Sequence, residues 1–237
     1  MTDDSARRGR FVTLEGPDGA GKSSQAVRLA EALRARGLPV VEAREPGGTR
    51  IGEAIRSLLL DPESGVRHDS LTDALLFVAA RAQLVTEVIR PALEADRLVV
   101  CDRFADSTLA YQGYAAGLDV EWLRTLNMHA TGGLVPDLTV LLDLPAEIGL
   151  ARRARGPGGE RTRFERSTEH DAAFHARVRG GYQRLAQEEP SRWRIVDAAR
   201  EPDRVAADVL SAVEALLARA GEPSSGEPIG ASVRSNG

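Results

Sequence analysis

The sequence predicts an α/β fold in which a central five-stranded parallel sheet lies between two layers of helices. Two observations lead to this prediction. Short β-branched runs alternate with longer stretches of helical period, which is typical of a parallel sheet covered on both faces. A glycine-rich stretch, LEGPDGAGKSSQ at residues 14–25, stands between the first of these runs and the first helical stretch. We therefore expect a three-layer α/β/α domain.

Each predicted element follows from its residue pattern. The five runs expected to be strands cover residues 10–15, 39–44, 97–102, 137–143 and 192–198. The stretches with helical period cover residues 22–36, 71–94 and 172–187. In the second of these, apolar residues recur at spacings of four and three, which predicts one stripe facing the core. This stripe consists of Leu71, Leu75, Val78, Ala82, Val85 and Ile89.

Length, charge and composition limit the domain number and the function class. The 237 residues fit one domain over residues 10–220, with a flexible segment before it (1–9) and a disordered Gly/Ser/Pro-rich tail after it (221–237). A net charge of -4 argues against a nucleic-acid partner, which would need a surplus of Lys and Arg. No apolar run is long enough to cross a membrane, and the N-terminus has no apolar signal core. We therefore expect a cytoplasmic protein without a membrane partner.

The glycine-rich stretch matches the phosphate-binding pattern GxxxxGK[ST] through Gly16, Gly21, Lys22 and Ser23. Lys22 is expected to reach the β- and γ-phosphates of ATP as a catalytic residue, and the Ser23 hydroxyl is expected to ligate Mg²⁺. The alternative is a chance glycine turn with a solvated lysine, which the order of strand, loop and helix disfavours. The residues expected to bind ATP are Gly16, Pro17, Asp18, Gly19, Ala20, Gly21, Lys22, Ser23 and Ser24.

A second ligand for Mg²⁺ is expected after a buried strand, and Asp102 follows the apolar run RLVVC. The alternative is that Asp102 only caps the next helix. Its neighbour Arg103 and the polar run that follows favour the functional interpretation. Binding of Mg-ATP alone leaves transferases, switches and motors as candidate classes.

A kinase also needs a second pocket that holds an acceptor in line with the γ-phosphate. Phe77 and Arg81 are four residues apart and share one flank of the predicted helix, so an aromatic ring and a guanidinium can together bind a base. The alternative is a peripheral core residue beside a surface charge. Two strand ends bring further polar residues to the edge where open α/β sheets bind ligands. They supply Glu45, Arg56, Arg103, Ser107, Thr108, Tyr111 and Gln112.

The segments EGPDGAGKS, EPGGT, LFVAARAQ and DRFADSTLAYQG, in this order, closely resemble those of the thymidylate kinase family of P-loop nucleoside monophosphate kinases. The resemblance covers residues 10–217. It implies the P-loop NTPase α/β fold with a short arginine-rich lid. It also implies transfer of the γ-phosphate of ATP to dTMP, giving dTDP and ADP in dTTP synthesis, with Mg²⁺ as the cofactor of ATP and a homodimer as the assembly.

The resemblance further implies which residues bind the thymine base. Phe77 would stack on the ring and Arg81 would contact its edge. Thr108 and Gln112 would help to recognise the base and hold the nucleotide.

The same resemblance implies contacts to the rest of dTMP. Arg56 and Arg103 would bind its phosphate, and Arg103 would also act in catalysis close to the transferred group. Asp18 would hydrogen-bond the 3′-hydroxyl, and Glu45 would lie near the transferred phosphate. The full set expected to bind dTMP is Asp18, Glu45, Arg56, Phe77, Arg81, Arg103, Ser107, Thr108 and Gln112.

Members of this family take a catalytic arginine either from the phosphate loop or from a mobile lid. The variable positions of this loop hold no arginine, so the basic segment at residues 150–167 is expected to supply it. The alternative is a solvated, disordered basic loop. Thr162 stands where the family usually has an aspartate. The lid residues expected to act in catalysis are Arg153, Arg155 and Arg163.

Other functions remain open from the residues alone. A deoxynucleoside kinase or another nucleoside monophosphate kinase would share the loop and the Asp-Arg pair, but would not explain EPGGT and YQG together. A nucleotide-dependent switch or assembly ATPase would need no acceptor. A non-catalytic homologue is disfavoured by the intact Lys22, Ser23, Asp102 and Arg103. Separately, Glu45 precedes Pro46 in a predicted tight turn, which makes that bond a candidate for the cis form.

Overall fold

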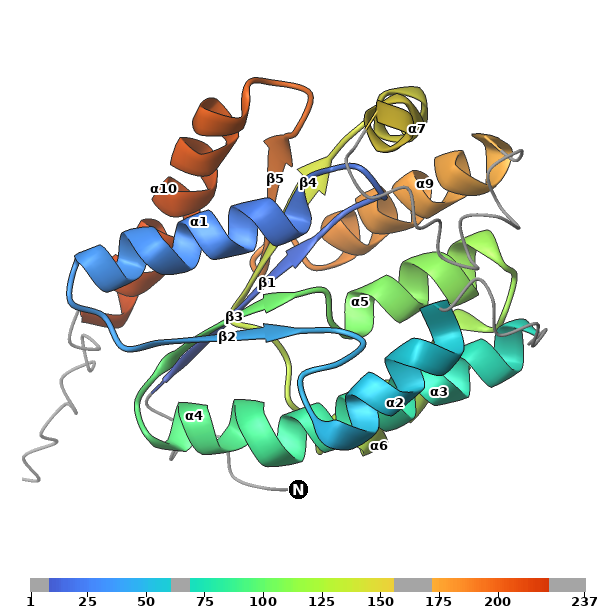
Figure 1. Cartoon of the computed structure of the whole chain (residues 1–237), viewed down its shortest axis with the longest axis horizontal. Coiled ribbons are helices and arrows are strands. Elements are labelled where there is room, and N and C mark those ends of the chain that lie inside the picture. Colours follow the sequence, from blue (N-terminus) through green and yellow to red (C-terminus); the bar gives the residue numbers. More distant parts are fainter. Residues whose placement is uncertain (1–8, 61–68, 156–171, 222–237) are drawn as a thin grey trace, which may run out of the picture.

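A computed structural model describes residues 9–60, 69–155 and 172–221 of the chain. Its centre is a five-stranded parallel sheet with the strand order β2-β3-β1-β4-β5 (Figure 1). The strands are β1 (Arg10–Glu15), β2 (Val40–Arg44), β3 (Leu98–Asp102), β4 (Leu138–Asp143) and β5 (Trp193–Asp197). The sequence prediction of the strands is confirmed, because each observed boundary agrees with it to within one residue.

Helices cover both faces of the sheet, as a buried parallel sheet requires. One face carries α1 (Lys22–Ala35) and α10 (Pro202–Gly221), as Figure 1 shows. Most other helices lie on the opposite face. They are α2 (Arg50–Leu60), α3 (Ser70–Leu84), α4 (Arg90–Glu94), α5 (Ala105–Thr108), α6 (Val120–Thr131) and α9 (Ala172–Glu188), and α7 (Ala146–Arg155) follows β4. The π-helical turn η2 (Val85–Ile89) joins α3 to α4, and a second one, η3 (Leu109–Ala115), continues α5. None of the helices in the described ranges is long and apolar enough to span a membrane.

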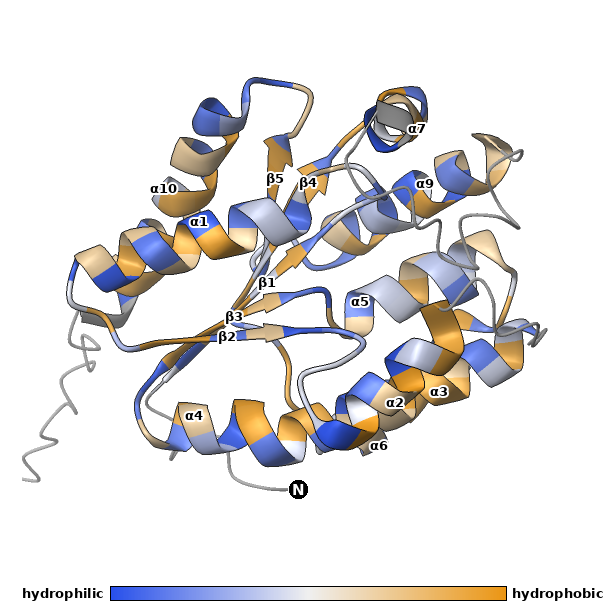
Figure 2. Cartoon of the chain, in the orientation of Figure 1, coloured by the Kyte–Doolittle hydropathy of each residue, from blue (hydrophilic) through white to orange (hydrophobic). Residues whose placement is uncertain are grey.

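Alternate residues of the central strand β1 enter two separate cores. Val12 and Leu14 pack with the apolar sides of α1 and α10, whereas Phe11 packs with η2 and α4 on the other face. In Figure 2 the strands are mostly coloured as hydrophobic, while the helices change from hydrophobic to hydrophilic around their circumference. Two polar residues of β1, Thr13 and Glu15, are nevertheless completely buried.

The predicted helices are present, but the predicted stripe on the second one is wrong in its first half. Residues 71–94 form a continuous run of α3, η2 and α4, and Val78, Val85 and Ile89 are buried as expected. Leu71 and Leu75 are instead exposed. The buried face of α3 instead includes Arg81, whose charge is paired with buried Glu45, so it does not follow the leucines. This face consists of Asp73, Ala74, Val78, Ala80, Arg81 and Leu84.

Several predicted segments lie largely outside the described residues. These are the N-terminal segment up to residue 8, the lid from residue 156 to 167 and the tail from residue 222. Gly9, assigned from the sequence to the N-terminal segment, is buried and donates its N–H to Leu93 O.

Candidate active site

The phosphate-binding loop connects the end of β1 to the start of α1. Gly16 has a φ of 145°, and a Cβ at this position would approach Leu142 O to 2.5 Å, so a larger residue cannot fit beside β4. Lys22, the first residue of α1, folds back over the loop and donates hydrogen bonds of 2.9 Å to Gly16 O and Pro17 O. The ammonium group is thereby held in the middle of the loop, where phosphates would bind.

Lys22 is the most strongly shielded charge of the loop, with 6% of its surface exposed. Burial and, next, the positive charge of Arg103 lower the pKa of Lys22 to about 8, although Asp18 and Asp102 oppose this shift. A lysine in this state lacks a nearby counter-charge strong enough to offset its desolvation. Polyphosphate would supply that charge.

Ser23 and Asp102, the two expected metal ligands, lie in contact. The Ser23 hydroxyl donates to Asp102 Oδ2 over 2.5 Å. The other carboxylate oxygen, Asp102 Oδ1, is buried and has no hydrogen-bond partner among the described residues. Mg²⁺ typically binds through one or two protein oxygens, with water and phosphate oxygens completing its shell. The residues present therefore fit Mg²⁺ bound together with a nucleotide.

A cavity of about 460 Å³ opens beside the phosphate-binding loop. Its lining comes from the phosphate-binding loop and α1, from the segments that follow β2 and β3, and from α3 and α7. The predicted site residues in this lining are Asp18, Gly19, Gly21, Lys22, Ser23, Ser24, Glu45, Arg56, Phe77, Asp102, Arg103, Ser107, Thr108, Tyr111, Gln112 and Arg153. Apart from the lid residues Arg155 and Arg163, four predicted residues are not part of it: Gly16, Pro17, Ala20 and Arg81.

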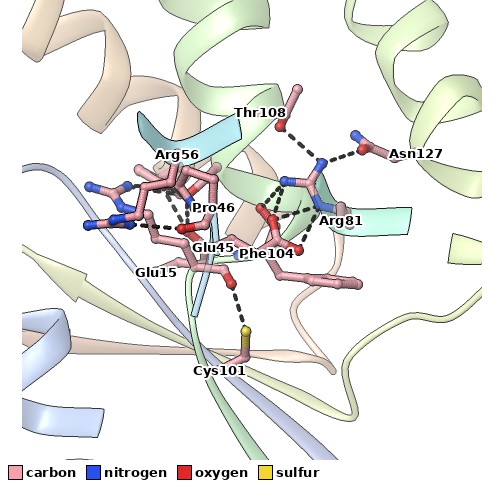
Figure 3. Close-up of polar contacts among 12 residues, drawn as sticks. Glu15, Glu45, Pro46, Arg56, Arg81, Cys101, Phe104, Thr108 and Asn127 are labelled. Carbon is pink, nitrogen blue, oxygen red and sulfur yellow. Dashed lines mark hydrogen bonds and ion pairs between the residues drawn. The ribbon is translucent and has the colours of Figure 1, made fainter. Parts of the chain in front are cut away.

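Arg81 lies behind the cavity wall, with 1% of its surface exposed (Figure 3). Its Nε and Nη2 groups bind the carboxylate of Glu45, and Nη2 also donates to Phe104 O. Its Nη1 group donates to Thr108 Oγ1 at 3.1 Å and to Asn127 Oδ1 at 2.6 Å. All five N–H donors of the guanidinium are thus used. A contact between Arg81 and a base would have to replace one of these bonds.

The turn after β2 carries the next wall of the cavity. The Glu45–Pro46 peptide bond is cis, as the sequence suggested for this turn. Arg56 of α2 reaches back to the turn and donates to Pro46 O over 2.8 Å (Figure 3). Glu45 therefore faces Arg81 while Arg56 lines the cavity.

Arg103 lines the cavity between Asp18 of the phosphate-binding loop and the ring of Tyr111. Its backbone has a φ of 70°, a conformation that costs a non-glycine residue about 1 kcal/mol or more. Its N–H donates to Leu14 O, which ties this turn to β1. The guanidinium binds Asp18 at 2.5 Å and lies over the ring of Tyr111.

Asp18 binds two arginines from different elements. One carboxylate oxygen pairs with Arg103 and the other with Arg153 of α7, at 3.1 Å. Burial raises the pKa of Asp18, but Arg103, Lys22 and Arg153 outweigh it and hold this pKa well below its usual range. Asp18 therefore stays ionised throughout the neutral pH range. For the other lid arginines, Arg155 is the last residue of α7, and Arg163 lies outside the described residues.

Some residues of the site were not selected from the sequence. Arg44 and Leu60 line the cavity, Asn127 holds Arg81, and Glu15 lies beneath Arg103. Arg44 and Glu15 are the last residues of their strands, which is a usable sequence signal at this edge of a sheet. Leu60 and Asn127 carry no such signal, because only the packing of α2 and α6 brings them here.

Comparison with known proteins gives one consistent result. The thymidylate kinase family model matches residues 14–209. A thymidylate kinase of Desulfovibrio desulfuricans is 53% identical over 89% of this chain and 98% of its own length. Its counterpart in Thermomicrobium roseum is 51% identical over 88% and 96% of the two chains. The crystal structure of thymidylate kinase from Ehrlichia chaffeensis is 33% identical and superimposes with a TM-score of 0.68, covering 86% of this chain and 98% of that one.

Proposed function

Because the chain belongs to the thymidylate kinase family, we propose that it transfers the γ-phosphate of ATP to dTMP, giving dTDP and ADP. The observation that best supports this activity is the single cavity in which a phosphate-binding loop and a polar, aromatic pocket meet at Arg103. A switch or motor needs only the first of these parts. The second part gives an acceptor nucleotide a place in line with the γ-phosphate.

The ATP end of the proposed site is the loop from Gly16 to Ser24. Its backbone N–H groups and the N-terminus of α1 bind the phosphates, and Lys22 binds the β- and γ-phosphates. Ser23 and Asp102 would hold Mg²⁺, which when bound would supply positive charge to the phosphate oxygens.

At the acceptor end, Phe77 stacks on thymine while Thr108 and Gln112 bind its edge. Arg81 acts on the base mainly through Thr108, which it holds by a hydrogen bond. The phosphate of dTMP lies between Arg56 and Arg103, with Ser107 beside it. Glu45 lies near this phosphate and balances the positive charge of Arg81 through an ion pair.

Transfer needs positive charge around the migrating phosphoryl group, and arginines in such positions raise rates by about 10³ to 10⁵. Arg103 supplies one such charge, and Arg153, Arg155 and Arg163 of the lid supply the others when ATP is bound. Asp18 exchanges its contact with Arg153 for one with the 3′-hydroxyl when dTMP binds. Single substitution of the three lid arginines is expected to lower kcat at least tenfold in one or more cases.

The activity is tested by a coupled assay of ADP release with Mg-ATP and one acceptor at a time: dTMP, dUMP, dCMP, AMP, thymidine or none. Stimulation by dTMP well above every other acceptor is expected. Slow hydrolysis that no acceptor stimulates would instead identify a nucleotide-dependent switch. We further propose that the enzyme is cytoplasmic and forms a homodimer. Exposed apolar side chains on α3 and α6 support the homodimer.

A further inference from the structure

Glu15, the last residue of β1, is a completely buried carboxylate that the proposed mechanism does not use. One oxygen accepts the Phe104 N–H at 2.7 Å. The other accepts two hydroxyl groups, from Ser107 at 2.6 Å and from Tyr182 at 2.9 Å. These three donors come from two different elements, so Glu15 joins the segment after β3 to α9.

The same two hydroxyl groups also contact Arg103. Its Nη1 donates to Ser107 Oγ at 3.2 Å and lies 3.5 Å from Tyr182 OH. A hydroxyl that gives its proton to Glu15 keeps its oxygen to accept from the guanidinium. The Ser107 and Tyr182 hydroxyls also lie 2.9 Å apart, and either can donate to the other. This chain runs from the guanidinium donors through two hydroxyls and ends at Glu15, which accepts hydrogen bonds without donating any when it is ionised.

We propose that Glu15 is a positioning residue, which orients the Arg103 guanidinium toward the transferred phosphate through the hydroxyls of Ser107 and Tyr182. This inference rests on the proposed kinase function. It assigns Glu15 no contact with either substrate, because Glu15 does not line the cavity.

The charged surroundings make the state of Glu15 sensitive to pH. Burial and then the negative charge of Asp106 raise the pKa of Glu15 to about 7, while Ser107, Arg103 and the Phe104 N–H oppose the shift. Burial also raises the pKa of Tyr182 well above its usual value, so that hydroxyl keeps its proton. The other titratable groups that act electrostatically with Glu15 are Lys22 and Cys101. Below pH 7, a protonated Glu15 would weaken the chain that holds Arg103.

The test is the Glu15→Gln variant, assayed after wild-type turnover of dTMP has been established. The amide keeps the size of the side chain, but its nitrogen must face either the Phe104 N–H or the two hydroxyl donors. We expect kcat to fall at least tenfold and KM for dTMP to rise, with less than a twofold change in KM for ATP. The fall of wild-type kcat on acidification through about pH 7 should be absent from the variant. Titration of dTMP itself is common to both proteins and cancels in the comparison.

Two further variants separate positioning from general loss of structure. Thr13→Val alters a completely buried polar residue on the same side of β1, where it donates to Thr139 and not to the Arg103 chain. It should keep wild-type kcat and the same pH profile. Tyr182→Phe removes one hydroxyl of the chain and should lower kcat less than Glu15→Gln does. The effects of Tyr182→Phe and Glu15→Gln on kcat should not add up in the double variant, since both substitutions act on Arg103.

A wild-type kcat and pH profile in a folded Glu15→Gln enzyme would overturn the proposal. If Glu15→Gln does not fold, Tyr182→Phe decides: an unchanged kcat for dTMP overturns the proposal, and a reduced kcat with an unchanged KM for ATP supports it. Failure of the wild-type enzyme to use dTMP would instead contradict the kinase function and is observed before any variant is compared.

Discussion

Lys22 is the only lysine in the 237-residue sequence; the other thirty of its 31 Lys and Arg residues are arginines. Arginine binds phosphate with a fixed fork of donors, whereas lysine is a compact charge that can approach the β- and γ-phosphates from within a tight loop. A lysine at this position agrees with the geometry of the loop, because its Nζ donates hydrogen bonds to two loop carbonyls.

Because the sequence has no other lysine, the pKa of Lys22 can be measured directly. Protein labelled with [¹⁵N]lysine should give one side-chain resonance, titrating near pH 8 in the free enzyme because burial and Arg103 disfavour the charged form. ATP should raise this pKa by adding negative charge. Since kcat/KM reports the free enzyme, kcat/KM for ATP should fall above pH 8, approaching about tenfold per pH unit. A midpoint near the ordinary lysine value would contradict the assignment of Lys22 to a desolvated site.

At the same scale, the sequence predicted which side chains reach the cavity better than it predicted their partners. Phe77 and Thr108 line the cavity as expected. Arg81 was expected on a flank of its helix, yet it is buried because Glu45, Thr108 and Asn127 together satisfy its charge and its donors. Such a network joins residues up to 46 positions apart, which no local pattern can reveal.

At the scale of elements, the phosphate-binding loop and α7 approach each other without intervening side chains. A Cβ at Gly149 of α7 would collide with the Asp18 carbonyl oxygen, a backbone atom that cannot move aside. Arg152 of α7 donates to Ala198 O over 2.8 Å, so α7 is also tied to the turn after β5. Helix α7 therefore fixes the base of the lid against the loop that would hold ATP.

Substitution of Gly149 by Ala is expected to push α7 away from this loop. Overpacking of this kind costs about 1–3 kcal/mol of unfolding free energy, and kcat should fall because Arg153 moves from Asp18. Gly180→Ala on α9 is the matched control, since a Cβ there has nothing within 4 Å. The control should be stabilised by about 0.4–1 kcal/mol and keep its activity. Denaturant unfolding with kcat measurements would test both variants, and equal behaviour of the two would disprove the close approach.

The strands were predicted to within one residue because a buried parallel strand leaves an almost continuous apolar run. The prediction of the stripe on α3 was wrong for a physical reason. The hydrophobic period shows which side chains are apolar, but it does not show which of them other parts of the same chain bury. Leu71 and Leu75 are apolar but exposed, whereas Asp73 and Arg81 are polar but buried. Arg81 can be buried because its charge is paired with that of Glu45 beside the cavity.

At the scale of the whole molecule, the order of the strands in the sheet determines which strand ends meet at the candidate site. The sequence predicted that polar strand ends share one edge of the sheet, but it did not show that β2, β3 and β1 are direct neighbours. This adjacency brings Glu45, Asp102 and Gly16 into one site. It arises from the crossover connections and the packing of helices on both faces, which are properties of the complete chain.

The described part of the chain also exposes apolar side chains on two neighbouring helices. Leu71 and Leu75 on α3 and Trp122 and Met128 on the neighbouring α6 are all more than two-fifths exposed. Scattered exposed leucines are ordinary, but a group on two adjacent helices favours a protein interface. A second copy of this chain, placed by the two-fold symmetry common among homo-oligomers, would cover them.

The resulting prediction concerns the oligomeric state. Wild-type protein should sediment as a dimer at micromolar concentration, and the double variant Leu75→Glu/Met128→Glu should sediment as a monomer, because each charge would be buried without a partner. Val27→Glu on α1 is the matched control, since Val27 is as exposed as Leu75, at 47%, but lies on the opposite face of the sheet. This control should remain dimeric. A monomeric wild type would reject the assembly, whereas a dimer that survives the double substitution would move the interface away from α3 and α6.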